Sequence, residues 1–334
     1  MHDLRDAFSA PDSTPSLDDG QKPSVWSRRI LPGIVIATVV LIAMTLGGWF
    51  WTGLFTLGFF QGYKELSALM HAKNISPSKA IAVPVGFLLI VCAAFNKVNY
   101  LTPLITLGII ASFVSLVFRR PTGSISDIGA TLLAILYLGF LPAHYILLRS
   151  LNSGITTGLD SSALPGVFAG IFPEDGFGYV LFTIVVISIS DIGAYYVGKA
   201  FGKHLLYPEI SPKKTTEGAY GGILCGVLVA VLFAQLTNFP MHHALMLSIL
   251  LVITGQLGDL SESLLKRDAG LKDSGGLLKG HGGILDRTDS YIFSGAVSYY
   301  YIHWIVLQQG IAQDVLQLLE MPLLGFTPCC WVLT

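Results

Sequence analysis

The longest uncharged stretch of the chain covers residues 218–258 and reads GAYGGILCGVLVAVLFAQLTNFPMHHALMLSILLVITGQLG. It holds no Asp, Glu, Lys or Arg over 41 positions, whereas a helix needs only about 20 apolar residues to cross the hydrocarbon core of a bilayer. The residues Thr237-Asn238-Phe239-Pro240 interrupt it with a turn-forming sequence. The stretch therefore predicts two membrane-spanning helices, near 219–236 and 243–265.

The composition of the whole chain agrees with this. Of its 334 residues, 52% are hydrophobic and only 12% are charged, and the mean hydropathy is +0.65. Soluble domains carry about 25% charged residues, so a soluble enzyme is excluded. No long basic run accompanies the net charge of −1 to suggest a nucleic-acid partner, and the four cysteines have no disulfide or zinc-type spacing.

Other apolar runs each fit one crossing. The run 30–63 is too long for one helix and is expected to break at Gly47-Gly48. We predict an all-α, polytopic integral membrane bundle of about nine transmembrane helices, the remaining ones near 30–47, 49–69, 80–96, 98–118, 128–148, 176–198 and 289–309.

The distribution of basic residues predicts the orientation. With a cytosolic N-terminus, 18 of the 20 Lys and Arg residues fall on the cytosolic side, and only Lys97 and Arg149 fall outside. The polar loops 199–217 and 266–288 then face the cytosol. We therefore expect a multi-pass protein whose active site faces the cytosol.

The same pattern divides the chain into regions. The predicted regions are a disordered cytosolic tail (1–27), N-terminal transmembrane helices (28–150), a non-cytoplasmic loop (151–176), a catalytic transmembrane region with cytosolic loops (177–310) and a C-terminal tail (311–334).

Polar residues gather where the eighth predicted span ends. Asp259, Glu262, Ser263 and Lys266 follow the spacing i, i+3, i+4 and i+7 and so share one helix face. An ionised carboxylate within the apolar zone costs about 2.5–3.5 kcal/mol, which suggests a bound cation or a basic partner. The alternative is a polar helix end that simply enters water.

A glycine-rich charged loop follows this helix. Its glycines, including those of Gly280-His281-Gly282-Gly283, allow a backbone to fold around phosphate oxygens. Asp286 and Asp289 share a helix face, and with Asp259 they could supply the carboxylate oxygens that Mg²⁺ prefers. The alternative is a solvated connector.

A second cluster surrounds the sixth predicted span. Asp191, Tyr195 and Lys199 lie on one face, and Lys213-Lys214 follow in the next loop. Asp191 could equally make a hydrogen bond to a neighbouring helix, and the lysines could be ordinary cytosolic anchors. Lys64-Glu65 is expected to be a snorkelling pair near a helix end.

Several of these segments together resemble the signature of the phosphatidate cytidylyltransferase (CDP-diacylglycerol synthase) family. They are SLLKR (263–267), KDSG (272–275) and HGGILDRTDS (281–290), with DIGAY (191–195) and SPKKT (211–215) upstream. The resemblance covers about 185–295. Lys279 and Thr216 depart from it, because the family usually has proline and often has tryptophan at these positions.

The resemblance implies transfer of a cytidylyl group from CTP to phosphatidic acid in the bilayer, with Mg²⁺ as cofactor; it leaves open a second, monovalent cation and a homodimer. It implies metal ligands at Asp259, Asp286 and Asp289, and catalytic roles for these three with Lys266, Lys272 and His281. The implied substrate-binding residues are Lys213, Lys214, Ser263, Arg267, Asp273, Gly282, Gly283, Arg287 and Asp191.

Two other functions stay open at this point. A CTP-dependent polyprenol or phytol kinase would use the same nucleotide and metal but would transfer the terminal phosphate. An ion transporter would use Asp191 and Asp259 as intramembrane cation sites, although transport requires no glycine-rich basic loop.

Overall fold

The computed structural model describes residues 31–118, 123–152, 175–271, 274 and 283–308. Two compact units divide at Val39–Val40. The first contributes only the opening turns of α1 (Leu31–Leu46) to the described part of the chain. All packing discussed below lies within the second unit.

The predicted break between the first two spans is confirmed. The first helix, α1, ends at Leu46, and α2 (Gly48–His71) starts two residues later. Gly47 and Gly48 have φ values of 61° and 46°, in the left-handed region that residues with a Cβ rarely adopt. The two glycines thus end one helix and start the next without strain.

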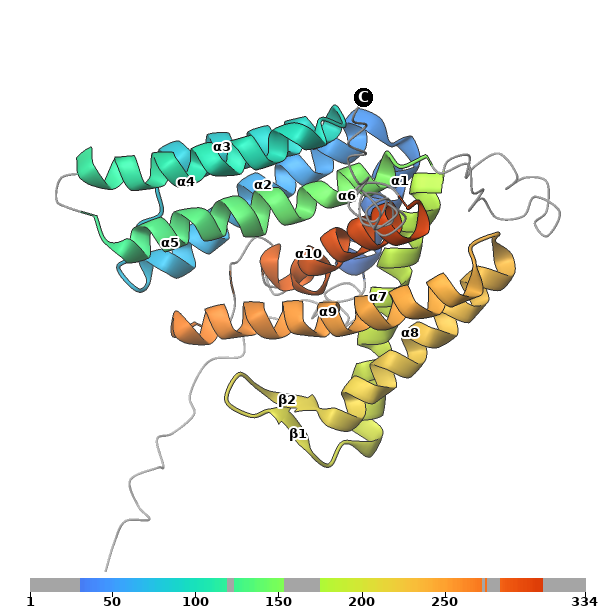
Figure 1. Ribbon diagram of the computed structural model, residues 1–334. Coiled ribbons are helices and arrows are strands. Elements are labelled where there is room, and N and C mark those ends of the chain that lie inside the picture. The colour runs from blue at the N-terminus through green and yellow to red at the C-terminus, as the bar shows by residue number, and fades with distance from the viewer. Residues whose placement is uncertain (1–30, 119–122, 153–174, 272–273, 275–282, 309–334) are drawn as a thin grey trace, which may run out of the picture. The chain divides into compact units, whose positions relative to one another are not determined.

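Figure 1 shows the next helices. Most of them contribute residues to a buried apolar core. They are α3 (Lys79–Ala94), the short η2 (Val98–Tyr100), α4 (Leu101–Phe118), α5 (Ile125–Leu133), the π-helical η3 (Ala134–Phe140) and α6 (Leu141–Arg149). The last three form one continuous helical stretch where the sequence predicts a single span over 128–148.

The C-terminal half contains four more helices. They are α7 (Asp175–Phe201), α8 (Thr216–Leu236), α9 (Met241–Asp268) and α10 (Leu285–Tyr300), which continues as the π-helical η4 (Tyr301–Val306). The chain leaves the helical conformation between Leu236 and Met241, as predicted, and Pro240 is the N-cap of α9. The longest uncharged stretch therefore does form two helices.

Helices α7 and α8 pack closely because glycines lie at their contact (Figure 1). A Cβ at Gly218 would come within 2.7 Å of the Ala194 carbonyl oxygen, and one at Gly198 within 3.5 Å of the Gly218 Cα. Small residues of this kind allow helix backbones to approach each other in membrane proteins. This contact holds the C-terminal end of α7 beside the N-terminal end of α8, and the segment 202–215 connects the two.

That segment contains a small β-hairpin, which the sequence did not predict and which is a minor addition to a fold that is helical as expected. Strands β1 (Leu205–Tyr207) and β2 (Ser211–Thr215) pair antiparallel between α7 and α8. Glu217 accepts hydrogen bonds from the Lys203 and His204 amides at 3.1 and 3.2 Å. The polar sequence of β2 lacks the apolar alternation of a strand. The bonds to Glu217 connect the start of α8 to the residues just before β1.

The structure confirms the helical character of all nine predicted spans and supports membrane insertion of a subset. Five helical stretches of the described chain are long and apolar enough to cross a bilayer: Val98–Phe118, Ile125–Arg149, Asp175–Phe201, Thr216–Leu236 and Met241–Asp268. Gly33–Leu46 and Lys79–Ala94 are apolar but shorter. The chain is a helical membrane protein, and the count of nine crossings stays a prediction.

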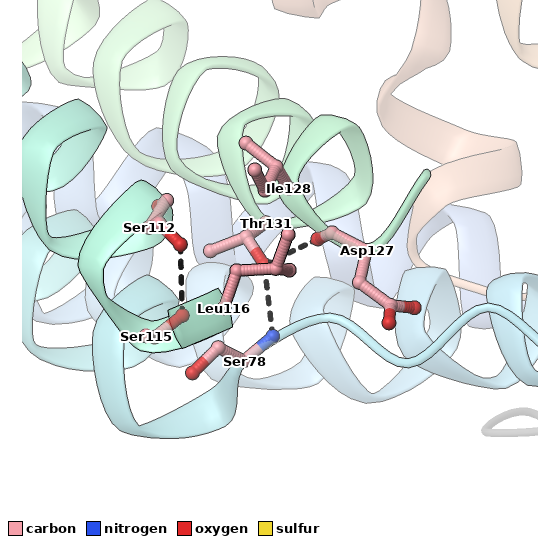
Figure 2. A pocket seen from close by; sticks show the side chains of 7 residues that line it. All are labelled: Ser78, Ser112, Ser115, Leu116, Asp127, Ile128 and Thr131. Atoms are coloured by element: carbon pink, nitrogen blue, oxygen red, sulfur yellow. Dashed lines mark hydrogen bonds between the residues drawn. The ribbon is translucent and has the colours of Figure 1, made fainter. Parts of the chain in front are cut away.

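Ser78, the N-cap of α3, and residues of α4 and α5 line a small polar pocket (Figure 2). The Thr131 hydroxyl accepts a hydrogen bond from the Ser78 amide at 2.9 Å. Asp127 and Ser124 form a capping box at the start of α5, and Asp127 also accepts from the Ser76 amide at 2.7 Å. Thr131 and Asp127 therefore secure helix ends, which is a structural role.

Candidate active site

The candidate site lies where α9 meets the start of α10, and glycines of α9 bring the two helices together. A Cβ at Gly258 would collide with the carbonyl oxygen of Asp289, and one at Gly255 would lie 3.4 Å from the carbonyl oxygen of Ser290. Asp259, the residue after Gly258, is therefore held beside the first turns of α10. This close approach positions carboxylates from two helices near each other.

Asp259 is paired with a lysine of the hairpin. The Lys214 ammonium lies 2.6 Å from an Asp259 oxygen, and the Ser263 hydroxyl donates to the other oxygen at 3.4 Å. The Lys214 and Asp259 side chains are 28% and 30% exposed, so the pair is open to an arriving ligand. The structure therefore brings Lys214, Asp259 and Ser263 together.

A second lysine lies between two carboxylates. Lys266 forms an ion pair with Glu262, one turn earlier on α9, and donates to Asp286 of α10 at 2.7 Å. Exposure is 12% for the Lys266 side chain, 1% for Glu262 and 14% for Asp286. Such enclosure makes Lys266 a link between α9 and α10 in this state of the molecule, rather than an open phosphate ligand.

Asp286 also ties together the two ends of the glycine-rich loop. One of its oxygens accepts from the Ser274 amide (3.1 Å), the Ser274 hydroxyl (2.9 Å) and the Gly283 amide (2.8 Å). Partial burial alone would raise the pKa of Asp286, but these bonds and the one from Lys266 outweigh it and lower the pKa to about 2. Asp286 is therefore a carboxylate anion held by four protein donors.

Glu65 of α2 holds the same region from the other side, which corrects the expectation of a snorkelling residue. It is only 4% exposed. Its two oxygens accept from the Ile284 and Leu285 amides, each at 3.0 Å, and the Ser274 hydroxyl lies 3.4 Å away. Lys64 is exposed. Of the two residues expected to extend toward the membrane surface, only Lys64 therefore faces outward.

Two further carboxylates, Asp191 and Asp289, interact electrostatically with Asp259. Asp191 of α7 accepts a hydrogen bond from the Ser290 side chain and interacts electrostatically with Asp259 and Lys214. Asp289 interacts in the same way with Asp259, Glu262 and Asp191. Within the described residues, no group of three or more His, Cys, Asp or Glu side chains has the geometry of a ready-made metal site.

The other predicted site residues are exposed, buried or outside the described residues. Lys213 and Arg287 are exposed, and exposed Arg267 directs its Nε toward the Ile210 carbonyl oxygen of the hairpin at 3.4 Å. Gly283 is buried against Glu65 and Ser274, where a side chain would collide with both. Predictions for Lys272, Asp273, His281 and Gly282 fall outside the described residues.

Sequence reasoning did not assign the roles of Glu65 and Glu262. The donors to Glu65 on Ser274, Ile284 and Leu285 are more than 200 positions away along the chain, so no local pattern reveals them. Glu262 lay on the predicted polar face, but only the structure shows that it is fully enclosed beside Lys266. The sequence did offer one signal. Both Glu65 and Glu262 are acidic residues next to long apolar segments, where a charge is costly.

These observations define a class: a helical membrane protein with a charged, glycine-supported site at the ends of its helices. The chain belongs to the cytidylyltransferase family, since the family model matches residues 27–305. It is accordingly a nucleotidyltransferase enzyme.

Several curated relatives match over most of their length. A Synechocystis protein named phosphatidate cytidylyltransferase is 34% identical over 289 residues, which cover 83% of this chain and 96% of the relative. A Bacillus subtilis protein of the same name is 32% identical over 279 residues (80% and 93%). The Arabidopsis thaliana protein named phosphatidate cytidylyltransferase 5, chloroplastic, is 32% identical over 323 residues (90% and 78%).

Proposed function

We propose that this protein is a phosphatidate cytidylyltransferase, which converts CTP and phosphatidic acid into CDP-diacylglycerol and pyrophosphate for phospholipid biosynthesis. The observation that carries the proposal is the gathering of the motif residues Lys214, Asp259, Lys266 and Asp286 at one place on the helix ends. Relatives of this name in bacteria and a plant support the substrate assignment.

The reaction joins a phosphate oxygen of phosphatidic acid to the α-phosphorus of CTP. The bond between the α-phosphorus and the bridging oxygen to the β-phosphorus breaks, and pyrophosphate leaves with that oxygen. The attacking phosphate is already an anion and requires no general base when doubly ionised. Catalysis is then mainly a matter of positioning two polyanions and neutralising their charge.

The two lysine sites suit different tasks. Lys214 is partly exposed on the hairpin beside exposed Lys213, so these two residues can turn to substrate phosphates. Lys266 is enclosed by Glu262 and Asp286 and keeps α9 and α10 in register. Arg267 and Arg287, both exposed, add positive charge at the rim.

The donor set also fits Mg²⁺. This ion is usually held by one or two carboxylates together with water and substrate phosphates, so no cluster of three carboxylates is required. Asp259 and Asp289, which interact electrostatically, would supply the carboxylate oxygens, with Asp191 nearby. Asp286 is a third predicted ligand, although four protein donors already bind it. A bound Mg²⁺ would draw charge from the phosphates as the bond to pyrophosphate breaks.

The proposal includes an orientation. A lipid substrate keeps its acyl chains in the bilayer, so the site must lie at a membrane surface, and the basic residues favour the cytosolic side. Nine crossings with a cytosolic N-terminus are part of this proposal, and a homodimer stays a prediction.

The test is an assay with full-length protein in mixed micelles, radiolabelled CTP, Mg²⁺ and phosphatidic acid. A CTP labelled on its α-phosphorus should give a labelled lipid and free pyrophosphate, and Asp259→Asn should abolish the product. CDP released together with an unlabelled phospho-lipid would instead identify a CTP-dependent lipid kinase. Undiminished activity of Asp259→Asn would refute the metal assignment.

A further inference from the structure

Helix α10 starts without a cap from its own sequence. Its N-cap residue, Ile284, has no side chain that accepts a hydrogen bond. The first amides of a helix have no intrahelical partner and need acceptors from elsewhere when they are buried. Leu285 is 2% exposed, so water has little access to the amides at this helix end.

Glu65 supplies the missing acceptors from a different helix. Its Oε1 accepts from the Ile284 amide and its Oε2 from the Leu285 amide, so one carboxylate satisfies two consecutive backbone donors. A negative charge at a helix N-terminus also interacts favourably with the helix dipole. Gln61, one turn earlier on α2, donates to Oε1 at 2.9 Å and fixes the orientation of the carboxylate.

The start of α10 carries the site's carboxylates. Asp286 and Asp289 lie in its first two turns, and Asp286 shares the Ser274 hydroxyl with Glu65 at 2.9 and 3.4 Å respectively. A displacement of the α10 start would therefore move Asp286 relative to Lys266, and Asp289 relative to Asp259. Misplacement by about 1 Å can reduce a reaction rate about 100-fold.

We propose that Glu65 is a positioning residue for cytidylyl transfer, which caps α10 from α2 and thereby sets the places of Asp286 and Asp289. The role rests on the proposed function, because it concerns the same site. Glu65 itself does not touch the reacting atoms. It acts through the backbone that it holds.

The chain provides a matched control. Asp127 is also a buried carboxylate, 9% exposed, that caps a helix start and accepts a backbone amide from a preceding segment. Asp127 belongs to α5 and lines the polar pocket that also contains Ser78 and Thr131 (Figure 2). Asp127→Ala therefore measures what the loss of a buried capping carboxylate does to the protein in general.

Two measurements on the full-length protein test the proposal. The first is amide hydrogen exchange at Ile284 and Leu285, which we expect to be at least tenfold faster in Glu65→Ala than in the wild type and unchanged in Asp127→Ala. The second is steady-state kinetics with CTP and phosphatidic acid. Here kcat should fall about 10- to 100-fold in Glu65→Ala, with a smaller change in KM. Glu65→Gln, which keeps one acceptor oxygen, should lie between wild type and Glu65→Ala.

Three results would overturn the positioning role: unchanged exchange in Glu65→Ala, a kcat within twofold of wild type, or an equal loss of kcat in Asp127→Ala. A wild-type protein that makes no CDP-lipid would instead overturn the proposed function. The exchange experiment would then still decide whether Glu65 caps α10, so the two failures are distinguishable.

Discussion

Lys266 provides the sharpest test of how the charged site is built. It is the cationic partner of two enclosed carboxylates, Glu262 at 1% and Asp286 at 14% side-chain exposure. Replacement by methionine keeps the length of the side chain but removes the charge. Removing one partner of a buried ion pair costs about 3–5 kcal/mol, because the remaining charge is left uncompensated.

The chain again offers an internal comparison. Lys73 and Asp268 form an ion pair of 2.5 Å, but their side chains are 38% and 60% exposed. Exposed pairs contribute about 0–1 kcal/mol. For 334 residues, an unfolding entropy of about 2.1 cal/mol/K per residue makes 1 kcal/mol equivalent to about 1.4 °C. The expected decrease in Tm is thus about 4–7 °C for Lys266→Met and at most about 1.5 °C for Lys73→Met.

Thermal unfolding of the purified full-length chain in one detergent, followed by tryptophan fluorescence, measures both variants. A double variant, Glu262→Gln with Lys266→Met, should regain much of the lost Tm. It removes the most enclosed charge, and Asp286 keeps its bonds from Ser274 and Gly283. The reasoning fails if Lys266→Met lowers Tm no more than Lys73→Met does, or if the double variant is less stable than the single one.

Three other predictions follow from the site. Gly258→Ala, whose Cβ would collide with the Asp289 carbonyl oxygen, should reduce kcat at least tenfold, whereas Gly53→Ala, with no atom within 4 Å of the added Cβ, should leave it unchanged; equal activities would contradict the close α9–α10 contact. Chelation of divalent ions should abolish product formation and added Mg²⁺ should restore it, so full activity in the chelator would exclude the proposed metal. A cysteine in place of exposed Lys213, in a background without the native cysteines, should react with an impermeant reagent only from the cytosolic side of sealed vesicles, and labelling from the other side would reverse the proposed orientation.

The helices were predictable because the thickness of a bilayer imposes a length on uncharged runs. Each predicted span coincides with a helical segment to within a few residues at most ends, and the breaks at Gly47-Gly48 and before Pro240 fall where expected. The hairpin was not predictable in the same way. The strand Ser211–Thr215 contains a proline and two lysines, and it lacks the apolar alternation of a strand.

The site was predictable only where its members are near in sequence. Asp259, Ser263 and Lys266 share a helix face, and this local pattern identified them. Which of them are enclosed depends on contacts between distant segments. Lys266 resembles a phosphate-binding lysine in the sequence, but its partners on α9 and α10 enclose it. For Glu65, three donors lie on residues 274–285, and helix periodicity along α2 carries no information about them.

The charge balance of the described site gives a physical reason to expect a divalent cation. Five carboxylates interact there, and two lysines pair with them directly. When all are ionised, this cluster is net negative and repels both CTP and phosphatidic acid. Exposed Lys213, Arg267 and Arg287 attract the substrates to the rim but do not cancel the charge between Asp259 and Asp289. Asp259 and Asp289 would hold a cation whose positive charge offsets this repulsion, and Lys214 could then turn from Asp259 to a phosphate. Activity should therefore depend on Mg²⁺ most steeply when Asp259 and Asp289 are both present.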